Sequence, residues 1–475
     1  MKLAFFSIQS AAMLAIAATI LSTAVVQGQQ IVPAPNDAGT TVTPSGDLLN
    51  ITGGQTSKDG ANLFHSFQEF GLREGQSANF ISTPAIRNIL GRVVGGNPSI
   101  INGLIQVSGG NSNLFLINPS GIIFGPNASL NLPGAFTATT ATNIGFDSGF
   151  FNVAGANDYS RLIGTPNTFY FNLSQPGSIL NAGNLAVMPG KSITLIGGTV
   201  VSTGSFNAPQ GNIIVAAVPG ENAVRISQEG HLLSLEIGVV DGELLAQNGQ
   251  LSLPLSLPQL LAGAGENSAT GISVNRAGEV VLTAGLRVQS GDVAIASSTV
   301  NSQNVTLSAA SNLTLVESQL LTEKNLYLLA GDTVRVRDGS YPFRAIAGGN
   351  LTIQGNQNID IFALNYPKPA FQSSEDITLL SNGTVSGDAH FAAGGNFAIL
   401  TLSGDRGRFV SLFDPIISSD GDVGFGDYTG TSLKVEAKGA IAAGDISIIG
   451  ADTTLSRSAD PDAAVLSGSP ALILR

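Results

Sequence analysis

The feature that most constrains the fold is a short pattern that recurs after about residue 180. It reads Gly, then Asn or Asp, then an apolar residue, any residue and another apolar residue, as at residues 349–353. Side chains alternate between the two faces of a strand, so the apolar positions share one face. Because Gly, Asn and Asp tolerate left-handed backbone, each copy predicts such a corner followed by a half-buried strand. The pattern begins at Gly183, Gly211, Gly291, Gly349, Gly395, Gly421 and Gly444.

The spacing of the strands predicts how they stack. Strand-like runs begin at Val305, Leu313, Leu326 and Val334, so short and long intervals alternate. A short and a long interval together make about 21 residues, a period typical of solenoids. An antiparallel meander needs no strict repeat, whereas a coil that returns above itself does, because equivalent strands must stack in register. We therefore predict an all-β fold, a right-handed parallel β-helix with two or three strands per coil and inward rows of Val, Ile and Leu.

Composition agrees with this fold and excludes some functions. Only 11% of the residues are charged, against a usual ~25%, and the chain has 58 Gly, no Cys and no Trp. The absence of cysteine removes disulfides, thiolate nucleophiles and sulfur-ligated metal sites. The net charge of −12 argues against a nucleic-acid partner, since binding to the phosphate backbone depends on clustered Lys and Arg.

The N-terminus has the features of a secretory signal peptide. Lys2 precedes an apolar run from Leu3 to Val26, and small and polar residues follow. We expect residues 1–28 to be a signal peptide, with cleavage near Gly28. The alternative is an uncleaved anchor, because the run is close to the ~20 residues that a membrane span needs.

One turn in the first third of the chain has strong local chemistry. Two short apolar strands, Leu114–Ile117 and Ile122–Phe124, flank the tetrapeptide Asn118-Pro119-Ser120-Gly121. Proline fixes φ at the second turn position, Asn118 can bond its own backbone, and Gly121 allows the exit. Taken alone, this is an ordinary turn in a β protein.

The surroundings of this turn give it more meaning. Upstream lies Asn62-Leu63-Phe64-His65-Ser66-Phe67, and Ser77–Phe80 and Gly103–Val107 follow in order. With the turn, these segments resemble the haemagglutination-activity domain of two-partner-secretion exoproteins, a family that includes filamentous haemagglutinins. The resemblance covers about Gln30–Phe146. The family signature is usually Asn-Pro-Asn-Gly; Ser120 replaces the second Asn and forms side-chain turns more weakly.

The resemblance implies a fold and a partner. The family is a parallel β-helix whose N-terminal cap would lie in the segment up to Arg73, with Phe64, Phe67 and Phe70 packing the first coils. Its members are recognised by the periplasmic domains of an outer-membrane β-barrel transporter and reach the cell surface or medium through the periplasm. We carry the transporter-recognition or folding motif over to Asn118, Pro119, Ser120, Gly121, Asn62 and Phe64.

The remaining chain is expected to continue the solenoid. Pro254 and Pro258 make residues 251–258 a poor central strand and predict a loop or small hairpin on the shaft. Residues 451–475 show neither a cap nor an anchor, so we expect the chain to end early within a longer repeat array. The predicted parts are a signal peptide (1–28), a haemagglutination-activity core (29–146), further β-helix repeats with insertions near 221–266 (147–450), and an irregular C-terminal tail (451–475).

The function expected is that of a secreted, non-enzymatic, adhesin-like surface protein with a host-cell or glycan receptor. The alternative is a carbohydrate-active β-helix enzyme, which would need paired carboxylates; a carrier of a secreted toxin is a third reading. His65, His231 and His390 share no ligand spacing. Asp420, Asp422 and Asp427 could hold calcium, but Asp422 is also a corner residue of the repeat. We therefore predict no catalytic, cofactor-binding or metal-binding residues and no cofactor.

Overall fold

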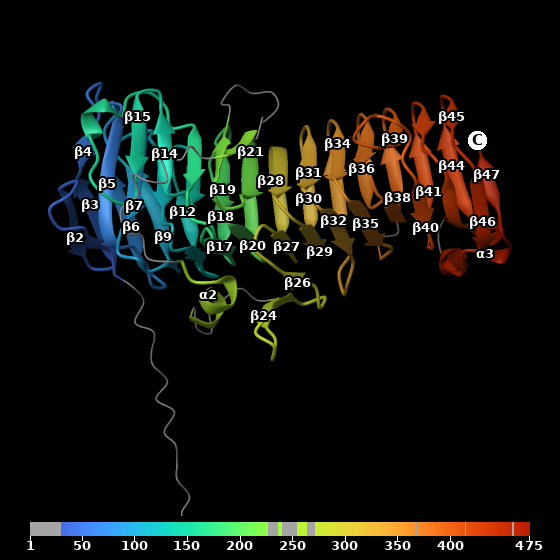
Figure 1. Cartoon of the computed structure of the whole chain (residues 1–475), viewed down its shortest axis with the longest axis horizontal. Coiled ribbons are helices and arrows are strands. Elements are labelled where there is room, and N and C mark those ends of the chain that lie inside the picture. Colours follow the sequence, from blue (N-terminus) through green and yellow to red (C-terminus); the bar gives the residue numbers. More distant parts are fainter. Residues whose placement is uncertain are drawn as a thin grey trace, which may run out of the picture.

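The computed structural model describes residues 30–226, 236–239, 254–263, 271–365, 368–413, 415–457 and 460–475. The predicted signal peptide and His231 lie outside these residues. The described chain forms one long rod, with the N-terminal strands at one end and the C-terminal strands at the other (Figure 1). Among the described residues, no helix has the length and apolar character needed to cross a membrane.

The rod is a parallel β-helix, as predicted, and each rung has three strands. In one rung, β30 (Gln319–Thr322), β31 (Leu326–Ala330) and β32 (Thr333–Arg337) pair in parallel with β33 (Arg344–Ala347), β34 (Leu351–Gly355) and β35 (Asn358–Ala363) of the next. We call these the first, second and third faces. Val305 lies beside Leu326 at the predicted spacing, and Leu326 lies beside Leu351 after a slightly longer rung.

The strands of each face stack along the rod, and three long strands, β21 (Ser205–Ala217), β28 (Thr299–Ala309) and β38 (Val385–Ala393), span two faces each. The first face also contains β6 (Ser77–Ile81), β9 (Leu104–Ser108), β12 (Ser129–Asn131), β18 (Asn184–Ala186), β36 (Phe371–Ser373), β41 (Ile416–Ser419) and β44 (Leu433–Ala437). The second contains β5 (Asn62–Glu69), β7 (Asn88–Val93), β10 (Asn113–Ile117), β13 (Phe136–Thr139), β19 (Ile193–Gly197), β37 (Ile377–Leu380), β39 (Phe397–Leu400), β42 (Val423–Gly424) and β45 (Ile441–Ala442). The third contains β8 (Ser99–Ile101), β11 (Ile122–Phe124), β17 (Ser178–Asn181), β20 (Thr199–Ser202), β27 (Val293–Ala296), β29 (Leu313–Val316), β40 (Phe409–Ser411), β43 (Tyr428–Thr431) and β46 (Ile446–Gly450).

The interior consists of the predicted inward aliphatic rows. On the second face, Val305, Leu326, Leu351 and Ile377 occupy equivalent positions in four consecutive rungs and are fully buried. All four belong to one apolar cluster that runs along the rod. Alternate residues such as Thr352 and Gln354 face outward and are half-buried. The hydrophobic effect therefore acts between rungs, because each new coil covers the apolar row of the one before.

The corner glycines are not explained by left-handed backbone, and that part of the prediction was wrong. Of the seven glycines that begin the repeated pattern, only Gly291 has a positive φ, of 85°. At Gly349, Gly395 and Gly421, a Cβ atom would instead lie 2.6, 2.3 and 2.5 Å from a side-chain oxygen of the preceding rung. Glycine is used at these corners because the preceding rung approaches closely there.

The oxygen that fills this space belongs to an Asn or Asp at the equivalent corner of the preceding rung. Each accepts a hydrogen bond from a backbone N–H one rung later, and we call this series the corner ladder. In four rungs a glycine precedes the residue whose N–H donates, and the N···O distances are 2.9, 2.6, 2.8 and 2.7 Å. In two rungs Lys324 or Glu375 precedes the donor, and the distances are longer, 3.2 and 3.1 Å. The ladder oxygens belong to Asn304, Asn325, Asn350, Asp376, Asn396 and Asp422.

The N-terminal end of the rod is closed by a cap, as the family resemblance implied. Strand β2 (Thr40–Ser45) forms an antiparallel hairpin with β3 (Leu48–Gly53), and β3 pairs with β6 of the first rung. The short strands β1 (Val32–Pro33) and β4 (Gln55–Thr56) pair antiparallel with β5. These segments cover the end of the first coil, which protects the strand edge from pairing with other chains.

Two groups of elements leave the solenoid and cover its N-terminal half. Five antiparallel strands form an extra-helical sheet. Two of them lie within residues 147–171, so this segment does not continue the β-helix repeat as predicted. The five strands are β14 (Asn143–Phe146), β15 (Gly149–Asn152), β16 (Thr168–Phe171), β22 (Asn222–Arg225) and β23 (Glu236–Val239), with the 3-10 helix η1 (Tyr159–Arg161) beside them. The second group is helix α2 (Leu257–Gly263) and the antiparallel strands β24 (Ile272–Val274), β25 (Val280–Leu282) and β26 (Arg287–Val288), below the rod in Figure 1.

Helix α2 replaces the loop or hairpin predicted around Pro254 and Pro258. Proline at the second position of the helix costs nothing there, because N–H groups in the first turn have no helical partner. The Gln259 side chain accepts hydrogen bonds from the Ser256 N–H and hydroxyl, both at 2.9 Å. Ser-x-x-Gln is a capping-box signature that marks a helix start in the sequence.

The C-terminal segment is also ordered, so the prediction of an irregular tail was wrong. It forms the 3-10 helix η3 (Thr453–Arg457), helix α3 (Ala463–Gly468) and strand β47 (Leu472–Leu474), which pairs in parallel with β44. The buried ammonium of Lys434 lies 2.8 Å from the Asp460 carboxylate and 3.1 Å from that of Asp462. The sequence did not predict this order for two reasons. Helix α3 is too short to show a periodic pattern, and its ion pairs join residues that are far apart along the chain.

Candidate functional site

The tetrapeptide Asn118–Gly121 forms the expected turn between β10 and β11. The side-chain oxygen of Asn118 accepts the Ser120 N–H at 3.0 Å, and its carbonyl oxygen accepts the Gly121 N–H at 3.1 Å. Its amide nitrogen donates to the Asn97 carbonyl at 2.9 Å and to the Ser99 hydroxyl at 3.0 Å. Asn118 thus fixes its own turn and ties it to the preceding rung.

This turn is buried. Asn118 is 0% exposed and Ser120 is 4% exposed, and Pro119 and Gly121 are buried as well. Gly121 has a φ of 122°, and a Cβ atom there would lie 3.2 Å from the Leu260 methyl groups of α2. The turn therefore needs glycine for both its backbone and its packing, and a downstream helix covers it.

Asn62 belongs to a second hydrogen-bonded series of side chains. Asn88 donates to the Asn62 side-chain oxygen at 2.8 Å, and Asn113 donates to that of Asn88 at 3.0 Å. The Asn62 amide also donates to the Leu162 and Gly164 carbonyls at 2.9 and 3.0 Å. Asn62 therefore connects the first rungs to the loop that leads into β16.

Phe64 lies outside the solenoid interior, contrary to the expectation that it packs the first coils. Its ring contacts Phe151 and Tyr159 of the extra-helical group, with centroids 5.1 and 5.3 Å apart. Phe67 and Phe70 do face the interior of the rod. Alternation along β5 gives the physical reason, since residues 64 and 67 point to opposite faces of one strand.

The predicted motif residues do not form one constellation. Asn62 is in register with Asn88 and Asn113, at the start of the second-face strands. The turn begins directly after Ile117, at the opposite end of β10. The two groups therefore lie at opposite edges of one face.

A buried ion pair beside Ser66 was not predicted. The Arg92 guanidinium lies 2.5 Å from the Asp37 carboxylate, donates to the Ser66 hydroxyl at 3.1 Å and donates to the Val153 carbonyl at 3.2 Å. Burial alone would raise the pKa of Asp37, but hydrogen bonds from Ser66, Tyr159 and Arg92 outweigh it and hold this pKa below its ordinary value. A lone arginine in the apolar run Asn88–Val93 was the signal in the sequence.

His65 lies in the apolar interior, where its ring contacts those of Phe67 and Phe80. Burial lowers the pKa of His65 to about 4, so the ring is neutral at pH 7. Its Nδ1 atom lies 3.3 Å from the Thr40 hydroxyl, and its Nε2 atom has no hydrogen-bond partner among the described residues. A buried neutral ring held by the cap is a packing group.

An outward-facing apolar row beside the turn was also missed. On the third face, Ile123, Leu180 and Val201 occupy equivalent outward positions in successive rungs and are buried. They form one apolar cluster with Leu257, Leu260 and Leu261 of α2. Continuous apolar runs such as Ile122-Ile123-Phe124 are typical of strands buried on both faces, and this was the available signal.

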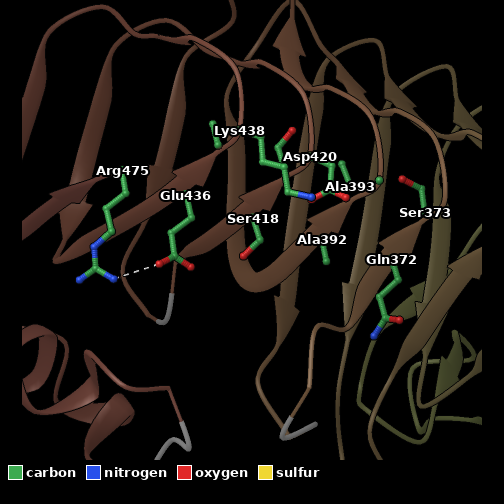
Figure 2. A pocket seen from close by; sticks show the side chains of 12 residues that line it. Gln372, Ser373, Ala392, Ala393, Ser418, Asp420, Glu436, Lys438 and Arg475 are labelled. Atoms are coloured by element: carbon green, nitrogen blue, oxygen red, sulfur yellow. Dashed lines mark hydrogen bonds and ion pairs between the residues drawn. The ribbon is translucent and has the colours of Figure 1, made fainter.

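An open groove of about 510 Å³ near the C-terminal end bears on the enzyme alternative (Figure 2). It contains the carboxylates of Asp420 and Glu436. Asp420 lies 2.9 Å from the Lys438 ammonium, and Glu436 lies 3.2 Å from the Arg475 guanidinium. Both carboxylates are thus engaged by cations, so this groove gives no specific support to glycan hydrolysis.

The acidic residues that were candidates for calcium have other partners. Asp422 and Asp427 accept the N–H groups of Ala440 and Asp445 one rung later, at 2.7 and 3.0 Å. Across the described residues, no group of three or more His, Asp or Glu side chains could hold a metal ion.

Fold and site together define a capped parallel β-helix whose first rungs are covered by extra-helical elements. Residues 29–254 match the family model of the TPS secretion domain. This part of the chain belongs to that family, the secretion domain of two-partner-secretion exoproteins, as its motifs indicated. The match continues past the expected core boundary at residue 146.

Similar proteins include very long chains. The chain is 26% identical over 337 residues to a tRNA nuclease CdiA of Escherichia coli strain STEC_O31, which covers 68% of this chain and 9% of the relative. It is also 26% identical over 337 residues to an Escherichia coli toxin CdiA, covering 68% of this chain and 10% of that one. The chain thus spans about a tenth of the length of these curated relatives.

Two solved secretion domains are similar to this chain. The HMW1 secretion domain of Haemophilus influenzae has a TM-score of 0.39 and 16% identity, covering 87% of this chain and 100% of that one. The filamentous hemagglutinin secretion domain has a TM-score of 0.31 and 14% identity, covering 88% of this chain and 99% of that one. The fold assignment above rests on the strand pairings themselves.

Proposed function

We propose that residues 29–254 are the part of the chain that a dedicated outer-membrane β-barrel transporter recognises through its periplasmic domains. The observation that carries this proposal is the match of this segment to the TPS secretion domain. The rest of the rod is then a passenger that reaches the cell surface or the medium. It serves contact with a host cell or a glycan, as an adhesin does, rather than catalysis.

The architecture supports folding in the direction of export. The cap closes the N-terminal edge, so new coils can be added only at the other end. The side-chain oxygen of each ladder residue belongs to the earlier rung and accepts an N–H of the later one. A rung that has formed therefore presents its acceptors and its apolar row to the segment that arrives next.

Secretion with and without a co-expressed transporter tests this function. Export of the wild-type chain should require the transporter. Replacing Asn118 by alanine removes hydrogen bonds to Asn97, Ser99 and Ser120, so we expect export to fall strongly or to leave degraded protein. Equal export of the wild-type chain in the absence of the transporter would refute the proposal.

Circular dichroism separates a folding defect from lost recognition. If Asn118→Ala secretes poorly but the purified chain keeps its β spectrum, the turn acts in recognition. If the spectrum is lost as well, the turn acts through folding. The matched control is Asn127→Ala, an exposed position in the next turn of the same segment; its export should equal that of the wild type.

A further inference from the structure

The outward row of the third face is continuously apolar only in the first part of the rod. Its members, which we call the outward row, lie side by side across five rungs at Ile100, Ile123, Leu180, Val201 and Ala294. In the next three rungs the equivalent positions are Thr314, Arg335 and Asp360. An outward apolar row costs free energy when it faces water, so its restriction to these rungs indicates a surface that is built to be covered.

Helix α2 shows what kind of segment fits this surface. Its leucines at positions 257, 260 and 261 have the i, i+3, i+4 spacing of a helix face that lies in an apolar groove. Leu260 is 1% exposed and also reaches the turn, where its methyl groups pack against Gly121. Helix α2 therefore buries both the outward row and the Asn118–Gly121 turn.

The order of the chain separates the surface from its cover. Apart from Ala294, the outward row is complete once β20 ends at Ser202. The first α2 leucine comes only at Leu257, and the strands β24–β26 follow later still. During folding from the N-terminus, the row and the turn are assembled before the segments that bury them.

We propose that the outward row and the Asn118–Gly121 turn form the surface that the transporter's periplasmic domains bind, and that α2 occupies the same surface afterwards. The partner contributes a short amphipathic segment with aliphatic side chains spaced as in α2. Docking of α2 then competes with the transporter and promotes release. This inference rests on the proposed function and assigns a surface to it.

The test compares two matched substitutions in the same segment. Leu257→Ser combined with Leu260→Ser removes two buried leucines of the cover, whereas Leu255→Ser changes an exposed leucine (39% exposed) that precedes the helix. The full-length variants are titrated with the purified periplasmic domains of the transporter that exports the wild-type chain. We expect the double variant to bind about tenfold tighter, because the competent surface is open in a larger fraction of molecules. Leu255→Ser should bind like the wild type.

A competition experiment completes the test without altering the rod. A synthetic peptide of residues 254–263 should displace the transporter domains from the double variant, and a scrambled peptide should not. Binding of the double variant that is unchanged or weaker, or a peptide without effect, would overturn the inference. If export depends on the transporter but these results are negative, only this inference fails; if export needs no transporter, the proposed function itself fails.

Discussion

Replacing Gly395 by alanine tests whether the corner ladder holds consecutive rungs together. A Cβ atom at this position would lie 2.3 Å from Asp376 Oδ1, the oxygen that accepts the Asn396 N–H at 2.6 Å. The carboxylate must move, and the hydrogen bond lengthens or breaks. Since φ of Gly395 is not in the left-handed region, the backbone itself accepts alanine without strain.

The magnitude follows from two opposing contributions. A hydrogen bond to a charged acceptor contributes about 1.5–3 kcal/mol. Alanine also restricts the unfolded chain, which stabilises the protein by about 0.4–1 kcal/mol. We therefore expect Gly395→Ala to lower the free energy of unfolding by about 1–2 kcal/mol. Glu375 occupies the equivalent position one rung earlier, and the Asp376 N–H that follows it still donates to Asn350 Oδ1 at 3.1 Å. A side chain at this corner is therefore compatible with the ladder bond, and we do not expect complete unfolding.

Gly424 provides the matched control, because a Cβ atom there meets nothing within 4 Å and its φ is not positive. Urea unfolding and amide hydrogen exchange at Asn396 measure the two variants, and Gly424→Ala should be neutral or slightly stabilising. In a double-mutant cycle with Asp376→Ala, the cost of Gly395→Ala should largely disappear. Equal effects of the two glycine substitutions, or strict additivity with Asp376→Ala, would refute this account of the corner glycines.

Three further predictions follow from buried polar groups. Asn118→Ala should lower the free energy of unfolding by about 3 kcal/mol, because the buried Ser99 hydroxyl, the buried Ser120 N–H and the Asn97 carbonyl lose their hydrogen bonds, and a loss below about 1 kcal/mol in urea titrations would contradict this. The pKa of His65 is about 4 when folded and 6.5 when unfolded, so the unfolded state binds more protons between these values, and stability should fall by about 3 kcal/mol as pH drops from 6.5 to 4. A His65→Phe variant should show a flatter pH profile in this window, and an unchanged profile would exclude His65 as the cause. Lys434→Met leaves the Asp460 and Asp462 carboxylates without their buried partner, so amide exchange in α3 should accelerate about tenfold or more, and unchanged exchange would show that the ion pairs do not hold the helix.

The sequence predicted more of the solenoid than of its coverings. The spacing of Val305 and Leu326 appears directly as strand register, because inward residues repeat from rung to rung. The extra-helical sheet around residues 147–171 was missed, since short antiparallel strands leave no periodic signal. Helix α2 was missed although Ser256 and Gln259 carry a capping-box signature. Pro258 argues against a central strand, but proline is also compatible with the first turn of a helix. A helix this short leaves no periodic pattern in the sequence that would distinguish the two.

The candidate site was predicted in part. The local chemistry of Asn118 was visible in the sequence, since the side chain bonds within its own turn. That this turn is buried beneath Leu260 was not visible, because helix α2 lies far downstream in the chain. The partners of Arg92 were likewise hidden, since they come from the cap and the extra-helical loop.

By itself the sequence determined the period, the inward rows, the turn and the family, because these depend on residues close together or repeated along the chain. Only the tertiary structure decided why the corner glycines are required, which way Phe64 faces and what covers the turn. Those outcomes depend on contacts between rungs and on segments that fold back from a distance. A periodic sequence specifies the shaft, whereas its covers depend on which outward faces are left apolar.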